Sequence, residues 1–215
     1  MKPITKQKKL EDSEQMKLLL ILSLTIITFE SFAISDTTHI IKVNFLYGSK
    51  PIKKYKTEKK AFGGIHGGHV SIELDNCDYG LNKQGKIHIF SHKKKHHSAY
   101  GVCRTEGNPV YPEGLKAVTF VIPLSSEQFE QLNKINQEYS KQTPYDYAFF
   151  GMRCAASAQY VLGQVGILEK RNRFSCVVTT FYPKKIRKRL YKIAKEKNYT
   201  IHFQEGRSTR KWERY

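Results

Sequence analysis

Residues 143–162 read TPYDYAFFGMRCAASAQYVL, and no other stretch of the sequence bears as strongly on the fold. A Gly-Met-Arg turn passes at Cys154 into a run of small residues, Ala155 to Ala158, which predicts a helix that begins near Arg153. Small side chains allow such a helix to pack closely against a sheet. We therefore expect Cys154 to stand at the N-terminus of a helix that covers a β-sheet.

The sheet is predicted from short segments that are β-branched, aromatic or alternating. In HVSIEL (69–74) the apolar residues fall on one face, and KIHIF (86–90) is expected to follow it as the second strand of an antiparallel hairpin. The segment 115–124 is apolar enough to be buried on both faces of the sheet. The expected strands are 39–47, 69–74, 86–90, 115–124 and 199–204.

Two further helices are predicted, one on each side of residues 143–162. Ser125 or Ser126 caps a helix that runs to about Ser140, and Pro183 opens another. The first of these has a core stripe of Phe129, Leu132, Ile135 and Tyr139. Strands come first in the chain and helices later, which is typical of an α+β fold in which a small antiparallel sheet packs against helices.

Residues 16–33 have the layout of a cleavable signal peptide. One lysine precedes an apolar run from Leu18 to Ile27, and the segment ends in small residues at Ser31 and Ala33. The apolar run is about ten residues long, roughly half of what a helix needs to cross a bilayer. A permanent membrane anchor is therefore the weaker interpretation.

This leader sets the expected domain boundaries. We expect residues 1–33 to be an N-terminal extension plus signal peptide, and 34–215 to be a single domain that works in the periplasm or outside the cell. The extension before Met16 is either a long n-region or lies upstream of the true start. No repeat or Gly/Ser linker in 34–215 marks a further boundary.

The composition is strongly basic. The chain has 37 Lys and Arg against 19 Asp and Glu, a formal net charge of +18 at pH 7. Such a charge favours anionic partners, which outside the cytoplasm are lipid head groups, lipopolysaccharide and acidic wall polymers. We expect an anionic envelope surface as a partner and no nucleic acid.

Of the four cysteines, Cys77 and Cys103 lie in loop-like segments where an exported chain can form a disulfide. Cys154 has different surroundings. At a helix N-terminus the helix dipole and the free N–H groups stabilise a thiolate and can hold an oxyanion, which makes a cysteine a nucleophile. The alternative is that Cys154 is a small buried hydrophobic residue, as most free cysteines are.

The candidate base for Cys154 is His69, which stands at the start of a predicted strand behind the glycine-rich segment FGGIHGG. A strand start fixes the ring at the rim of the sheet, and the glycines allow a substrate to come close. A Cys-His pair needs a third polar group to orient the imidazole. His88 is expected in that role on the neighbouring strand, with His92 and Asn82 as the other candidates.

A strand that begins Gly-His-Val, followed much later by a helix that begins Arg-Cys-Ala, resembles the circularly permuted papain-like families. These include permuted relatives of NlpC-type cell-wall peptidases and the lecithin retinol acyltransferase-like enzymes, in which the histidine strand precedes the cysteine helix. The resemblance covers roughly 69–165. It implies a permuted papain-like fold in which Cys154 is the nucleophile, His69 the base and His88 the polar third residue. Arg153 stands where the acyltransferase-like enzymes often carry Asn, and His88 follows His69 at a longer distance than in their pattern.

The resemblance also implies the expected activity. A thiol hydrolase or acyltransferase of this kind acts on an amide or ester bond, here of a peptide, peptidoglycan or lipid substrate. Tyr145, Tyr147 and Arg153 are expected to bind the substrate because they lie just before the cysteine helix. We expect no cofactor and a monomeric protein.

Two other functions fit the same sequence. One is a non-catalytic basic protein that binds anionic envelope polymers, since its basic residues need no particular positions. The other is a metal protein, although the tighter motifs of zinc sites are missing. Its ligands would come from the cluster His66, His69, His88, His92, His96 and His97.

Overall fold

A six-stranded antiparallel sheet and four helices make up the part of the chain that the computed structural model describes, which is residues 39–48, 68–85, 87–93, 97–103, 111 and 114–206. The fold is therefore α+β, as predicted. All described residues belong to one unit, Thr37–Tyr215. The predicted leader, 1–33, lies outside the described residues.

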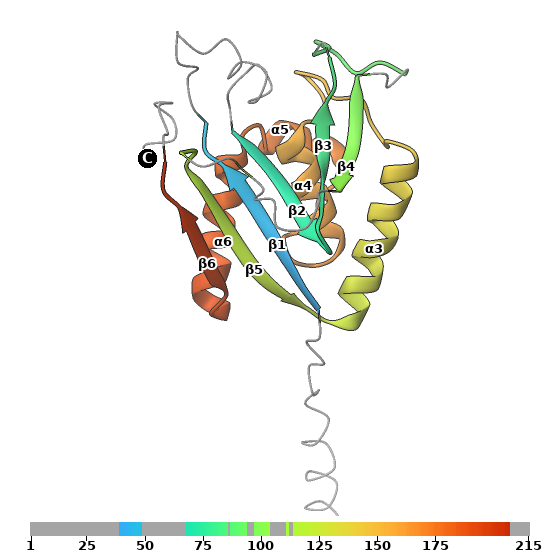
Figure 1. Ribbon diagram of the computed structural model, residues 1–215. Coiled ribbons are helices and arrows are strands. Elements are labelled where there is room, and N and C mark those ends of the chain that lie inside the picture. Colours follow the sequence, from blue (N-terminus) through green and yellow to red (C-terminus); the bar gives the residue numbers. More distant parts are fainter. Residues whose placement is uncertain are drawn as a thin grey trace, which may run out of the picture. The chain divides into compact units, whose positions relative to one another are not determined.

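The sheet has the strand order β4-β3-β2-β1-β5-β6, and every pair of neighbours is antiparallel (Figure 1). The strands predicted near 39–47, 69–74, 115–124 and 199–204 are confirmed. The bounds are β1 His39–Leu46, β2 His69–Leu74, β3 Cys77–Lys83, β4 Ser98–Cys103, β5 Ala117–Leu124 and β6 Thr200–Gln204.

The predicted hairpin partner of β2 is wrong. Strand β2 pairs with β3, which follows after a turn at Asp75 and Asn76. Both turn residues have positive φ, 48° and 61°, a conformation that Asp and Asn tolerate and that a tight hairpin turn requires. Strand β3 is rich in polar residues, and for that reason its sequence was interpreted as a loop. The segment predicted as the second strand contributes one isolated bridge, between His88 and Ala148.

Strand β4 was not predicted, and it is fastened to β3. The two cysteines in loop-like sequence, Cys77 and Cys103, stand opposite each other on these strands and form a disulfide. The two cysteines are 26 residues apart in the sequence, so the disulfide restricts the conformations that this stretch can adopt in the unfolded chain. The disulfide thereby fixes the pairing of β3 and β4 where β3 begins and β4 ends.

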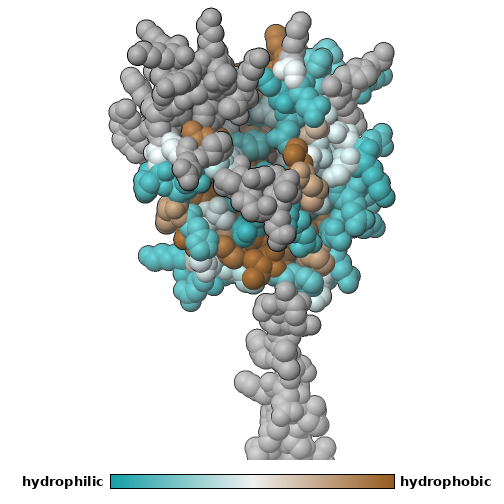
Figure 2. Space-filling view, in the orientation of Figure 1, coloured by the Kyte–Doolittle hydropathy of each residue, from teal (hydrophilic) through white to brown (hydrophobic). Residues whose placement is uncertain are grey.

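The hydrophobic core lies on one face of the sheet. The register places Val43 of β1 beside Ile72 of β2 and Phe120 of β5, and all three side chains are buried. Strand β5 was expected to be buried on both faces, but Thr119 is half-buried and Pro123 exposed, so it alternates. Figure 2 shows the face turned to the viewer in Figure 1, with hydrophilic residues around its edge and a hydrophobic area towards its lower end.

The helices are α3 Ser126–Lys141, α4 Cys154–Gln164, α5 Arg173–Thr179 and α6 Pro183–Lys197. Figure 1 shows α4, α5 and α6 behind the sheet and α3 beside β4. Helix α3 begins with the predicted cap, in which the Ser125 hydroxyl accepts from the Gln128 N–H and the Gln128 side chain accepts from the Ser125 N–H. Helix α5 was not predicted. Within the described residues, no helix combines the length and the apolar character that crossing a membrane demands.

Helix α4 is enclosed by the rest of the structure. It packs against β2 and β3 and also against α5 and α6, and nine of its eleven residues are buried. Ala155, Ala158 and Val161 belong to the same buried apolar cluster as the residues of the sheet, which agrees with the close packing that the small residues predicted. The first residue of this helix, Cys154, is therefore placed by the core of the protein.

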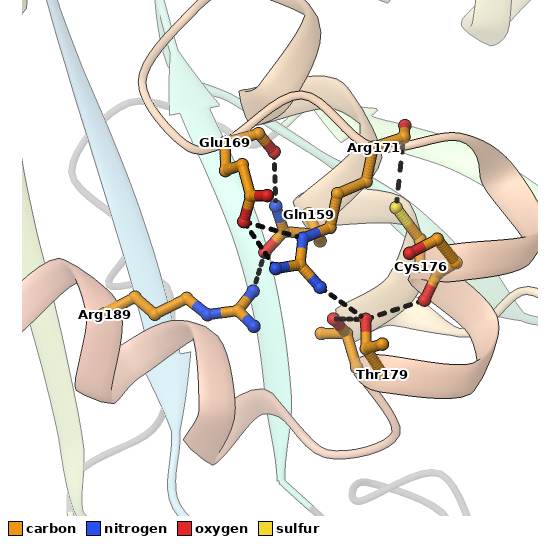
Figure 3. A network of polar contacts seen from close by, with 8 residues as sticks. Gln159, Glu169, Arg171, Cys176, Thr179 and Arg189 are labelled. Atoms are coloured by element: carbon orange, nitrogen blue, oxygen red, sulfur yellow. Dashed lines mark hydrogen bonds and ion pairs between the residues drawn. The ribbon is translucent and has the colours of Figure 1, made fainter.

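A polar network fixes the second half of α4 (Figure 3). The buried Gln159 donates to the Glu169 carbonyl at 3.1 Å and accepts from Arg189 of α6 at 2.6 Å. Arg171 bonds the Glu169 carboxylate and donates to the Thr179 hydroxyl of α5 at 3.2 Å. Because buried amide groups are costly unless both ends are paired, this network favours one orientation of α4 against α5 and α6.

Candidate active site

Cys154 is the first residue of α4, and its exposed fraction is 5%. Arg153 is the N-cap residue and makes no side-chain hydrogen bond to the first turn of the helix. The sulfur therefore lies at a helix N-terminus whose N–H groups are not occupied by an N-cap side chain. Partial positive charge at such a position favours a thiolate.

Three groups contact the Cys154 sulfur: the imidazole of His69, the backbone N–H of Val70 and the hydroxyl of Tyr147. Burial alone raises the pKa of a thiol, because it penalises the charged form. Here the charge and the hydrogen bond of His69, with the Val70 N–H and the Tyr147 hydroxyl, outweigh burial and leave the pKa of Cys154 below its ordinary value. The site thus favours the thiolate form of Cys154.

His69 reaches the sulfur from the first position of β2, opposite Leu46 of β1. Gly68 precedes it with φ 84°, a left-handed conformation that a glycine adopts at little cost. This residue turns the incoming chain into the strand, so the ring is presented at the end of the sheet that faces the start of α4. The structure therefore brings together His69 and Cys154, which lie far apart in the sequence.

His88, the predicted third residue, is held elsewhere. Its Nδ1 lies 2.6 Å from the carboxylate of Asp146, and its ring stacks on His92 with centroids 3.9 Å apart. The cause is the strand assignment, because residues 86–90 are not the neighbour of β2. His92, the second candidate, donates its backbone N–H to Asp146 at 2.9 Å.

Asn82, the third candidate, is on the strand that does adjoin His69. The recorded pairs of β2 and β3 run from Ile72 with Tyr79 to Leu74 with Cys77, and beyond them β3 has an irregularity between Asp78 and Leu81 in its pairing with β4. The Asn82 amide donates to the Gly80 carbonyl at 3.1 Å, which holds the side chain close to its own strand.

Only one of the three predicted substrate-binding residues touches the sulfur. Tyr147 does so, and burial together with the adjacent Cys154 raises the pKa of its hydroxyl. Tyr145 is buried in a second apolar cluster, where Ser157 donates to its hydroxyl at 3.4 Å.

Arg153 ties two segments of the chain together. Its guanidinium donates to the carbonyls of Phe149 and, at 3.0 Å, of Val177, and it lies 3.7 Å from the ring centroid of Phe181. The side chain is buried, and its Nε has no hydrogen-bond partner. Arg153 therefore links the segment before α4 to α5 and to Phe181, which lies two residues beyond the end of α5.

Asp146 was not singled out in the sequence, although PYDY places an acid between two aromatic residues just before the cysteine helix. Its carboxylate is buried and accepts from His88, from the His92 N–H and from the Ser98 hydroxyl at 2.9 Å. Burial raises the pKa of this carboxyl, but the three hydrogen bonds outweigh it and hold the pKa below its usual range. The same Ser98 oxygen accepts from the Tyr147 N–H at 2.7 Å, so Asp146 helps to position the residue that contacts the sulfur.

The histidine cluster does not form a metal centre among the described residues. No group of three or more His, Cys, Asp or Glu side chains in that part of the chain is arranged to hold a metal ion. His88 and His92 stack face to face, which does not point their ring nitrogens at a common centre. His66 and His96 lie outside the described residues.

The site is thus a cysteine at a helix N-terminus in contact with a histidine at the end of a sheet. Comparisons with protein families, with curated proteins and with solved structures found no match. The function accordingly rests on the geometry of this site.

Proposed function

We propose that the protein is an exported thiol hydrolase or acyltransferase that acts on an amide or ester bond. The observation that carries the proposal is the contact of the Cys154 sulfur with His69, with the thiol pKa lowered despite burial. A histidine strand that precedes the cysteine helix in the chain further supports a circularly permuted papain-like arrangement. The α+β architecture is consistent with that finer assignment.

The proposed reaction has two steps. His69 takes the proton of Cys154, the thiolate attacks the acyl carbon, and the first N–H groups of α4 hold the oxyanion. The C–N or C–O bond then breaks, and the imidazolium returns its proton to the leaving amine or alcohol. Water or another nucleophile, deprotonated by His69, cleaves the thioester and regenerates the thiol. This chemistry requires no cofactor.

Asn82 takes the place of His88 in this proposal. Of the three candidate residues, Asn82 lies on the strand that pairs with β2, whereas the Nδ1 of His88 is engaged by Asp146. Asn82 is therefore a positioning residue, since it acts on the thiol through His69. Tyr147 is the residue of the predicted substrate-binding set that is retained next to the reacting sulfur.

The proposed location is the periplasm or the exterior of the cell. The signal-peptide layout of 16–33 supports it, and so does the Cys77–Cys103 disulfide, because such bonds persist in oxidising compartments. The substrates available there include wall peptides and lipids. We propose a monomer that meets an anionic envelope surface.

Alkylation of the thiol tests the proposed nucleophile. The protein is treated with iodoacetamide from pH 5 to 9, and Cys154 and Cys176 are read separately by peptide mass. Cys154 is expected to react below pH 7 and to lose this reactivity in His69→Ala. Cys176 is the internal control, because it is also free and buried but burial raises its pKa.

Two outcomes would contradict the proposal. In one, Cys154 reacts no faster than Cys176 at any pH; in the other, it reacts with the same pH profile in His69→Ala. Circular dichroism of the variant checks that it is folded. Either outcome, in a folded variant, would leave Cys154 as a packing residue and favour the basic envelope-binding protein.

A further inference from the structure

Two segments next to the candidate active site form an exposed apolar tip, defined by Ile89, Phe90 and Phe150. Their exposed fractions are 64%, 66% and 59%. Single exposed apolar residues are ordinary, but these three come from segments far apart in the sequence and lie together. The rings of Phe90 and Phe150 stack with centroids 5.6 Å apart.

The apolar tip is held by the backbone. The Phe149 N–H donates to the His88 carbonyl and the Phe150 N–H to the Ile89 carbonyl, both at 2.8 Å. Asp146 fixes the base of the tip, because it accepts from the ring of His88 and from the backbone of His92. The exposed side chains are therefore presented by an ordered structure.

Aromatic contacts continue from the tip towards the cysteine helix. Phe150 contacts Phe149, with centroids 4.9 Å apart, and Phe149 contacts Phe181 at 5.3 Å. Arg153, the residue before Cys154, covers the other side of this row through its contact with Phe181. The apolar tip is thus connected to the start of α4 through neighbouring side chains.

We infer that the apolar tip is a docking surface for an anionic lipid bilayer. Exposed phenylalanine and isoleucine side chains gain free energy by entering the boundary between the lipid head groups and the acyl chains. The excess of positive charge, 37 basic against 19 acidic residues, complements anionic lipids, and one exposed base, Lys93, follows the tip in sequence. This inference does not depend on Cys154 being a nucleophile. Where the proposed chemistry also holds, docking would present the site to lipid-borne acyl groups.

The test places a fluorescent reporter on the tip. The only tryptophan of the chain, Trp212, is changed to Phe, and Phe150→Trp is introduced in that background. The matched control is Phe203→Trp on β6, where the native ring has an exposed fraction of 61%. The full-length proteins are mixed with phosphatidylglycerol vesicles that carry brominated acyl chains, and quenching of the indole is measured. The same vesicles of phosphatidylcholine test the charge dependence.

Strong quenching is expected for F150W with anionic vesicles and little for F203W, because bromine on the acyl chains quenches only an indole that enters the bilayer. Adding Phe90→Ser to F150W should weaken quenching at limiting lipid by about tenfold, since one buried aromatic is lost. Absence of quenching in F150W, or equal quenching at both positions, would overturn the inference. Unchanged circular dichroism shows that the variants are folded, and persistence of docking in Cys154→Ala separates this inference from the proposed chemistry.

Discussion

The clearest stability prediction concerns Asp146→Asn. The native carboxylate accepts three hydrogen bonds, two on Oδ2 and one on Oδ1. An amide has one oxygen, so it keeps at most the two bonds at one position, and the Ser98 hydroxyl loses its acceptor. Losing one bond to a charged group and the charge assistance of two others is expected to lower the free energy of unfolding by about 2–3 kcal/mol at pH 7.

The pH dependence of this loss is specific to a carboxylate. The folded pKa of Asp146 is lowered, so its contribution is fully present above the unfolded pKa, about 4, and disappears as pH falls through the folded pKa. The difference between the native protein and Asp146→Asn should therefore shrink as pH falls below 4. Urea unfolding at a series of pH values, followed by circular dichroism with the disulfide intact, measures it.

The matched control is Glu127→Gln, an exposed acid in the first turn of α3. That change removes a carboxylate without three buried hydrogen bonds, and we expect it to cost about 0.5 kcal/mol or less. A deficit of Asp146→Asn that stayed the same at pH 3 and pH 7 would refute the reasoning, since it would mean that shape rather than charge stabilises this position. A deficit no larger than that of the control would refute it as well.

Three further predictions concern the disulfide and the two residues proposed around the Cys-His pair. Replacing both Cys77 and Cys103 by Ser should lower the free energy of unfolding by about 3–4 kcal/mol, from the 26-residue separation that the bond closes, and denaturant unfolding measures it; no loss would mean that the unfolded chain is not restricted by the bond. Tyr147→Phe removes a hydroxyl that lowers the thiol pKa, so alkylation of Cys154 should shift to higher pH, and an unchanged profile would remove Tyr147 from the site. Asn82→Ala should slow alkylation of Cys154 at pH 6 to 7 without changing the rate at pH 9, where an unassisted thiol is also ionised; equal slowing at both would indicate a structural defect instead.

The sequence predicted the fold where local patterns and tertiary packing agree. The alternation of 69–74, the capping box at Ser125 and the proline that opens α6 each specify one local structure, and each was found. Strand β3 was missed because its polar composition resembles a loop and its tight turn depends on residues in the left-handed region. Helix α5 was missed because it is only seven residues long and includes two valines, which disfavour helices.

The error in β3 carried over into the candidate site. A third residue can be predicted only when the strand next to the histidine is known, and assigning that strand to 86–90 selected His88, whose ring lies against Asp146. Asp146 was missed for another reason. Its role depends on two donors near residues 88–92 and one at Ser98, and no periodic pattern in the sequence links these segments to residue 146.

The two free cysteines show what burial can and cannot decide. Both are buried and both lie in helices, yet the pKa of Cys176 is raised and that of Cys154 is lowered. Near Cys176, burial outweighs the charges of Arg171 and Arg189. Near Cys154, a histidine from another element and two further donors reach the sulfur. Since burial raises the pKa of either thiol, the opposite outcome at Cys154 must come from those partners, and removing them one at a time should return it step by step to the behaviour of Cys176.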